Sequence, residues 1–63
     1  MKKKISELVK GDVIADGTIV IKSYKSEYLQ KPVFIVWYLF TDGTSDFGSY
    51  QNADQLTVEM KGE

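Results

Sequence analysis

The strongest constraint on the fold of this chain is an uninterrupted apolar run at residues 33–40, VFIVWYLF, which lies between Pro32 and Asp42-Gly43. Three of its eight residues are β-branched and four are aromatic, the types that are enriched in strands. Eight residues are also few for a buried helix. Because both alternating faces of the run are apolar, we expect it to be the central strand of a β-sheet.

Two Asp-Gly pairs, Asp16-Gly17 and Asp42-Gly43, separate runs that favour strands. Such a pair indicates a tight hairpin, since a two-residue type I′ turn needs positive φ at both central positions. Residues 26–32 are read as a polar connection, with Pro32 opening the central strand because proline has no N–H for the sheet ladder. The predicted strands are residues 13–15, 18 to about 27, 33–40, 45–50 and 56–60.

The remaining segments are short. Residues 6–9 are expected to form a turn or a short 3₁₀ piece before Gly11, and residues 51–55 a 3₁₀-like break before the last strand. Residues 1–4 and 61–63 are expected to be frayed. At 63 residues the chain has room for one domain. We therefore predict an all-β, five-stranded, SH3-like small barrel covering residues 1–63, because closing the sheet on itself hides its edges.

Two motifs carry a resemblance to known proteins. Residues 6–14, SELVKGDVI, resemble the opening S-x-L-x-x-G-D-x-I of short phage and bacterial proteins with SH3-like or Hint-like barrels, and residues 40–44, FTDGT, resemble their F-x-D-G-T hairpin. The resemblance implies a small barrel from a phage, a prophage or a bacterium. It does not imply splicing or cleavage, because those Hint-like relatives need a first-residue Cys or Ser and a His, whereas this chain has Met1 and no His.

The composition argues against several classes of function. With neither Cys nor His, an ordinary zinc site is excluded and the usual general acid and base at neutral pH is missing. No base accompanies the Ser and Thr hydroxyls, and no Gly-rich phosphate loop is present. We therefore expect no enzyme activity, no catalytic residue, no metal and no cofactor. No apolar stretch is long enough to span a membrane, so we expect no membrane contact and a cytoplasmic location in a bacterium or phage-infected host cell.

The register of the hairpin at Asp42-Gly43 decides which face of the central strand is buried. With a two-residue turn, which we expect, Trp37 lies opposite Gly48 and an outward face carries Ile35, Trp37, Leu39 and Tyr50. The alternative is a type I turn with a bulge at Gly43, which shifts the register by one residue. Trp37 would then lie opposite Phe47, and its face would become the core.

An exposed aromatic patch favours binding over catalysis. We expect a non-enzymatic module that binds or modulates another protein through Ile35, Trp37, Leu39 and Tyr50, and self-association through the same patch is compatible with this. Two other hypotheses remain open. One is a structural, oligomeric subunit of a virion or complex. The other is a single-stranded nucleic-acid-binding barrel, which the sequence pI near 5.3 and the absence of Arg disfavour. Its candidate residues are Lys22, Tyr24, Lys25, Tyr28 and Lys31.

Overall fold

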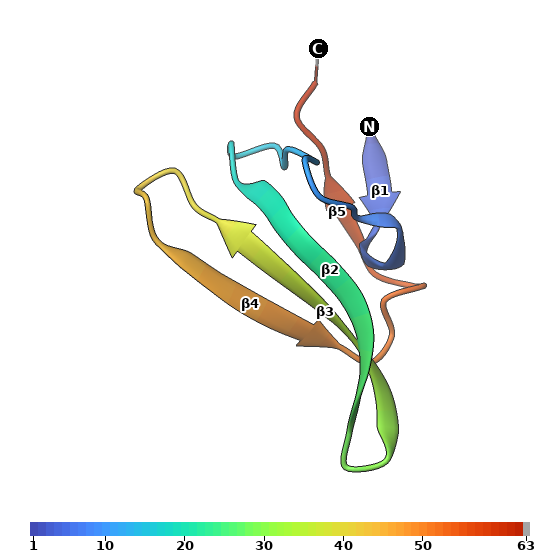
Figure 1. The fold of residues 1–63 in the computed structure, drawn as a ribbon. Coiled ribbons are helices and arrows are strands. Elements are labelled where there is room, and N and C mark those ends of the chain that lie inside the picture. Colours follow the sequence, from blue (N-terminus) through green and yellow to red (C-terminus); the bar gives the residue numbers. More distant parts are fainter. Residues whose placement is uncertain (63) are drawn as a thin grey trace.

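The computed structural model describes residues 1–62, which form five strands and one 3₁₀ helix (Figure 1). The strands lie in two antiparallel sheets, one of β1 and β5 and one in the order β2-β3-β4. The apolar run at residues 33–40 contributes most of the central strand, as predicted. The elements are β1 (Lys2–Lys4), η1 (Ile5–Glu7), β2 (Ile19–Tyr28), β3 (Lys31–Leu39), β4 (Ser45–Tyr50) and β5 (Thr57–Glu59).

The predicted barrel is wrong, although the all-β class is right. A closed barrel needs every strand paired on both sides, whereas in the described residues β1 pairs only with β5 and β4 pairs only with β3. The segment expected to be the first strand contributes only single bridges, Val13 with Ile19 and Ile14 with Met60. These bridges join the two sheets at one side. With β1 and β5 only three residues long, the other side stays open.

The N-terminal lysines form a strand and are not frayed as expected. Lys2, Lys3 and Lys4 pair with Glu59, Val58 and Thr57 of β5, and the two strands lie side by side near both termini in Figure 1. The half-buried Lys3 also forms an ion pair with Asp12, Nζ to Oδ2 at 2.8 Å. Three consecutive lysines carry no apolar alternation, so pattern reasoning had no signal for this strand. At the other end, the Lys61 N–H donates to the Val13 carbonyl, and Glu63 lies outside the described residues.

Both Asp-Gly turns are one residue longer than predicted. At the second turn the Phe40 N–H donates to the Thr44 carbonyl at 2.8 Å, and the Gly43 N–H donates to the Phe40 carbonyl at 3.1 Å. Gly43 has φ +89°. This is a type I turn closed by a bulge at a left-handed glycine. The prediction of a two-residue turn is therefore wrong, and the alternative prediction, a type I turn with a bulge at Gly43, is confirmed. Trp37 lies opposite Phe47, and Val36 lies opposite Gly48.

The two-residue geometry occurs elsewhere in the chain. The segment read as a polar connection is the end of a long β2–β3 hairpin, closed by Leu29 and Gln30 between the paired residues Tyr28 and Lys31. Leu29 and Gln30 have positive φ values of 50° and 63°. The hairpin extends past the end of β4 and away from β1 and β5 in Figure 1, and we call this extension the arm.

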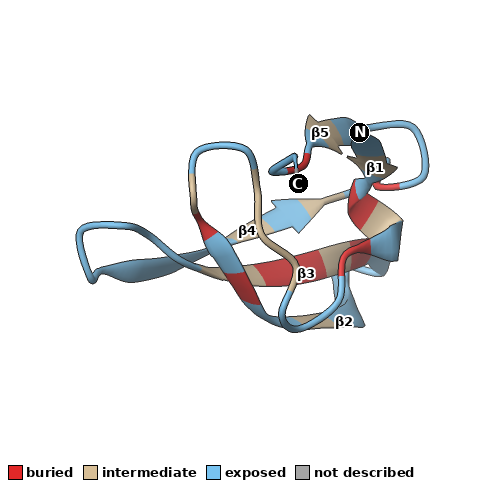
Figure 2. Ribbon diagram, turned by 90° about the horizontal axis from the view of Figure 1, so that it is seen from above, coloured by how far each residue is buried: buried red, intermediate tan, exposed pale blue. Residues whose placement is uncertain are grey.

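The core lies between the β2-β3-β4 sheet and the chain termini. Its buried residues come from β2, β3 and four other parts of the chain, and Figure 2 shows buried positions along β3 and at the start of β2. Val36 points into this core, so the shifted register did not make the Trp37 face the core, as the alternative had implied. The core lies on the Val36 side because η1 and the C-terminal segment place Ile5, Leu8, Ala53 and Met60 there. The cluster consists of Ile5, Leu8, Val20, Val36, Ala53 and Met60.

The flanking segments follow the predictions only in part. The expected 3₁₀ piece is η1, which lies one residue earlier than its predicted start and places Ile5 and Leu8 in the core. Residues 51–55 form a hydrogen-bonded turn, in which the Gln55 N–H donates to the Asn52 carbonyl at 2.9 Å. In the segment predicted as the last strand, residues 56–60, only Thr57–Glu59 form β5; Met60 is buried, and Leu56 is exposed.

Candidate functional site

One face of the β2-β3-β4 sheet points away from the core, and we call it the outer face. Residues paired across an antiparallel sheet share a face, and successive residues alternate. Val36 marks the core side, so Trp37 and its partners on both neighbouring strands mark the other side. The outer face comprises Ile19, Lys22, Tyr24, Ser26, Tyr28, Lys31, Val33, Ile35, Trp37, Leu39, Ser45, Phe47 and Ser49, with Tyr28 and Lys31 at the end of the arm.

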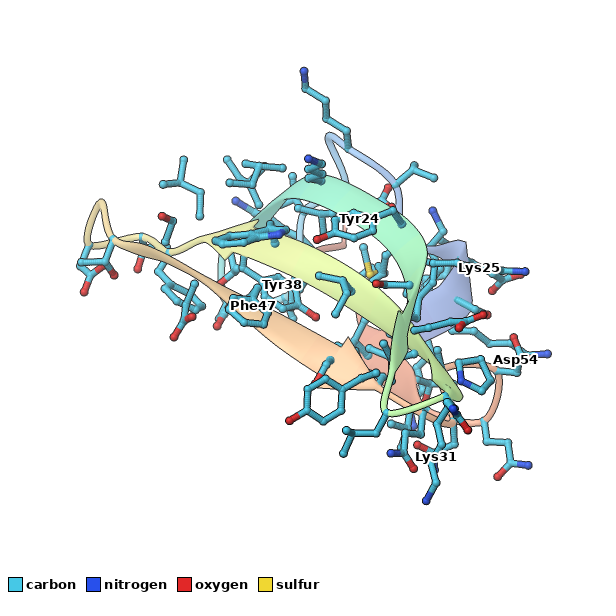
Figure 3. All side chains as sticks on the ribbon, turned by 60° about the horizontal axis from the view of Figure 1, so that its bottom comes forward. Tyr24, Lys25, Lys31, Tyr38, Phe47 and Asp54 are labelled. Carbon is cyan, nitrogen blue, oxygen red and sulfur yellow. The ribbon has the colours of Figure 1, made fainter. Side chains whose placement is uncertain are left out.

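Much of the outer face is apolar and exposed. Phe47 is 52% exposed and Tyr24 is 40% exposed, and Ile19 and Leu39 are also exposed. Phe47 and Tyr24 come from the two edge strands, on either side of β3 in Figure 3. A contiguous exposed apolar surface of this kind marks an interaction site more often than single exposed residues do.

Aromatic contacts give the outer face a fixed shape. The Trp37 and Phe47 rings lie opposite each other on β3 and β4, with centroids 4.8 Å apart and planes tilted by 37°. On β2 the Lys22 ammonium lies 5.2 Å from the centroid of the Tyr24 ring. Tilted aromatic pairs and cation–π contacts each contribute about 0.5–1.5 kcal/mol. The face is therefore organised before any partner binds.

The outer face holds little charge. Its charged side chains are Lys22 on β2 and Lys31 at the end of the arm, and serines supply most of the other polar side chains. Asp46 of β4 lies on the core side, opposite Tyr38. A surface with two separated lysines and no carboxylate suits a weakly charged partner surface more than a highly charged one.

The edge of β4 is less suited to binding than its outer face. The Phe47 backbone N–H donates to the Asp46 side chain at 2.8 Å. An N–H held in this way is not free to pair with an added strand, and a charged side chain on an edge strand opposes pairing. We conclude that a partner would meet the outer face rather than extend the sheet.

Three of the four predicted patch residues share the outer face: Ile35, Trp37 and Leu39. Among them, Leu39 is exposed, Trp37 is half-buried and Ile35 is buried. Tyr50 does not belong with them, because the one-residue register shift places it on the core side, opposite Phe34. The same shift places Phe47 on the outer face, where it pairs with Trp37. If the longer turn at Asp42-Gly43 had been predicted, the positions of both Tyr50 and Phe47 would have followed from it.

Tyr50 contributes to packing on the core side of the sheet instead. Its hydroxyl lies 2.8 Å from that of Tyr38, and its ring covers Gly48, where an added Cβ would lie 2.5 Å from Tyr50 Oη. Burial, and then the Tyr50 hydroxyl, raise the pKa of Tyr38 well above its ordinary value.

The predicted nucleic-acid residues do not all share one surface. Lys22 and Tyr24 lie on the outer face, whereas Lys25 pairs with Phe34 on the opposite side. There Lys25 lines a groove together with Asp54, and Figure 3 shows both away from Tyr24. Tyr28 and Lys31 form the last pair of the arm and, by the same alternation, lie on the side of Lys22 and Tyr24. Four of the five predicted residues therefore share that side, and Lys25 does not.

Three aspartates accept hydrogen bonds at the turns near β2 and between β3 and β4. The hydrogen bond from the Lys3 ammonium lowers the pKa of Asp12, and hydrogen bonds from Thr18 and Thr44 lower the pKa values of Asp16 and Asp42. Among the described residues no three carboxylates gather closely enough to hold a metal ion. In the same part of the chain, no helix has the length and apolar character needed to cross a membrane.

Comparisons of this chain with models of protein families, with curated proteins and with solved structures gave no match.

Proposed function

We propose that this protein is a non-enzymatic binding module whose outer face docks against a protein surface. The observation that carries the proposal is the exposed, nearly uncharged aromatic face around the Trp37–Phe47 pair. Aromatic side chains are the usual anchors of protein interfaces, since they bury large areas with few rotatable bonds. On the resemblance of its two motifs, we place the module in the cytoplasm of a bacterium or phage-infected cell, as a modulator of another protein or a subunit of a complex.

A protein surface fits this face better than a nucleic acid does. Binding of a single strand needs cations along the backbone path as well as rings for base stacking. The outer face supplies several aromatic rings but only two lysines, Lys22 and Lys31. Salt-sensitive binding of single-stranded oligonucleotides that is lost in a Lys22→Gln variant would favour the nucleic-acid hypothesis instead.

The test places a photocrosslinking phenylalanine analogue at Phe47 in cells that express the protein. The control places it at Val9, which is as exposed as Phe47, at 54%, but lies outside the outer face. We expect protein adducts from position 47 and none of matching mass from position 9. The absence of adducts at position 47, with the labelled protein folded, would contradict the proposal.

A further inference from the structure

We propose that the partner of the outer face is a second copy of this chain, so that two three-stranded sheets stack face to face in a symmetric dimer. This inference rests on the proposed function, because it names the occupant of the same face. Three observations select this occupant: the amount of exposed surface, the thinness of the molecule and the charge pattern of the face.

The chain exposes more surface than its mass predicts. Its accessible area is 4671 Å² for a mass of 7.2 kDa. The scaling for compact monomers gives about 4,100 Å² at this mass, which leaves an excess of about 550 Å². If each copy buried that excess, the interface would total about 1,100 Å², just above the ~1,000 Å² that a specific interface needs.

The molecule is also thin. Its Cα atoms span 38 × 24 × 14 Å, so the shortest dimension holds little more than one pair of packed layers. Among the described residues, the largest side chains that are less than 2% exposed are Leu8, Val20 and Val36. Stacking a second sheet on the outer face would add a second apolar layer about 10 Å away, as in a β-sandwich. The dimer would thus bury the Trp37–Phe47 pair without moving any strand.

The charge pattern permits self-pairing. A symmetric interface pairs a patch with a copy of itself, so both sides carry the same net charge and a highly charged patch would repel its copy. The outer face contains two charges. The Lys22 ammonium lies over the Tyr24 ring, and Lys31 lies at the end of the arm. The whole chain has a net charge of −1, which gives little repulsion between copies.

The experiment measures molar mass by sedimentation equilibrium at protein concentrations from about 1 µM to about 1 mM. Dissociation constants of dimers with small interfaces are expected in this range. The wild-type protein should approach twice the mass of the chain as concentration rises. Phe47→Ser should keep the chain mass throughout, while Val9→Ser, a substitution at an equally exposed site off the face, should dimerise like wild type. Far-ultraviolet circular dichroism confirms folding of each variant. If Phe47→Ser does not fold, Leu39→Lys replaces it with the same expected result.

The outcomes separate the dimer from the broader proposal. A wild-type chain that remains monomeric at the highest concentration overturns the dimer. If photocrosslinking at position 47 then still gives adducts with a different protein, the binding module stands with another partner. If the protein is monomeric and position 47 gives no adducts, both the dimer and the binding module are contradicted. Dimerisation that Phe47→Ser leaves unchanged would place the interface elsewhere and also overturn the inference.

Discussion

At the scale of single residues, the threonine after each Asp-Gly pair selects the longer turn. The Thr18 and Thr44 N–H groups donate to the Asp16 and Asp42 carboxylates, both at 2.9 Å. This places the aspartate at the third position of a type I turn and leaves the left-handed bulge position to the glycine. The Asp-Gly pair alone predicted a two-residue turn, because that pair is common to both turn types.

Replacing each turn glycine by alanine should give two different costs. Gly43→Ala should lower the free energy of unfolding by about 1–2 kcal/mol, because only the positive φ is strained. Gly17→Ala should cost more, since the added Cβ would lie 2.9 Å from Thr41 Cγ2. Urea denaturation at one protein concentration measures both. Adding Thr41→Ser should bring the Gly17→Ala cost down to that of Gly43→Ala, and equal costs without it would contradict this account.

The same hydrogen bonds make the second turn sensitive to acid. The Thr44 hydroxyl donates to Asp42 Oδ1 at 2.6 Å and, with the Thr44 N–H, lowers the Asp42 pKa below its ordinary value of 3.8. The stabilisation from this turn is therefore complete well above pH 3.8 and is lost as the pH falls through the lower folded-state pKa. Thr44→Val should raise the Asp42 pKa, measured by NMR titration of its carboxyl carbon. The Asp16 pKa, which depends on Thr18, should stay unchanged.

At the scale of elements, prediction succeeded where one segment determines its own structure. The apolar run at residues 33–40 supplies most of β3, and Ile35, Trp37 and Leu39 share a face because alternation is a local rule. Prediction failed where pairing decides the structure. Lys2–Lys4 becomes a strand only through its pairing with β5, and Tyr50 changes face because a bulge 7 residues earlier, at Gly43, shifts the whole of β4.

The turn at the end of the arm holds two non-glycine residues in a strained backbone conformation. Leu29 and Gln30 both adopt left-handed backbone conformations that side chains with a Cβ disfavour, and Leu29 is 78% exposed. Replacing the pair by Asn-Gly, the sequence that suits this turn, should raise the free energy of unfolding by about 1 kcal/mol or more. Leu29→Ala, which keeps the strained backbone, should give no such gain. Thermal unfolding of the two variants and the wild type measures the effect. Equal melting temperatures for the Asn-Gly variant and the wild type would contradict the argument.

At the scale of the whole molecule, the two sheets are held together by segments near the chain ends. β1 lies along β5, the Met60 N–H donates to the Met1 carbonyl at 2.8 Å, and Ile14 bridges Met60 on the other side of the same segment. The small C-terminal strand therefore depends on partners from both sides. This arrangement could not be read from the sequence, since a Lys-rich terminus is typical of an exposed tail.

Removing residues 1–4 should abolish cooperative unfolding, because the deletion leaves β5 without its strand partner and Asp12 without Lys3. The control replaces the exposed Lys2 and Lys4 by threonine, which keeps the backbone pairing and favours a strand. It should unfold cooperatively, at or above the wild-type temperature, in a circular dichroism melt. If the truncated chain melts like wild type and the double threonine variant does not, then the lysine charges and not the β1 backbone stabilise this end of the molecule. The expected pattern assigns the lysine run to the fold and leaves the outer face as the surface available to a partner.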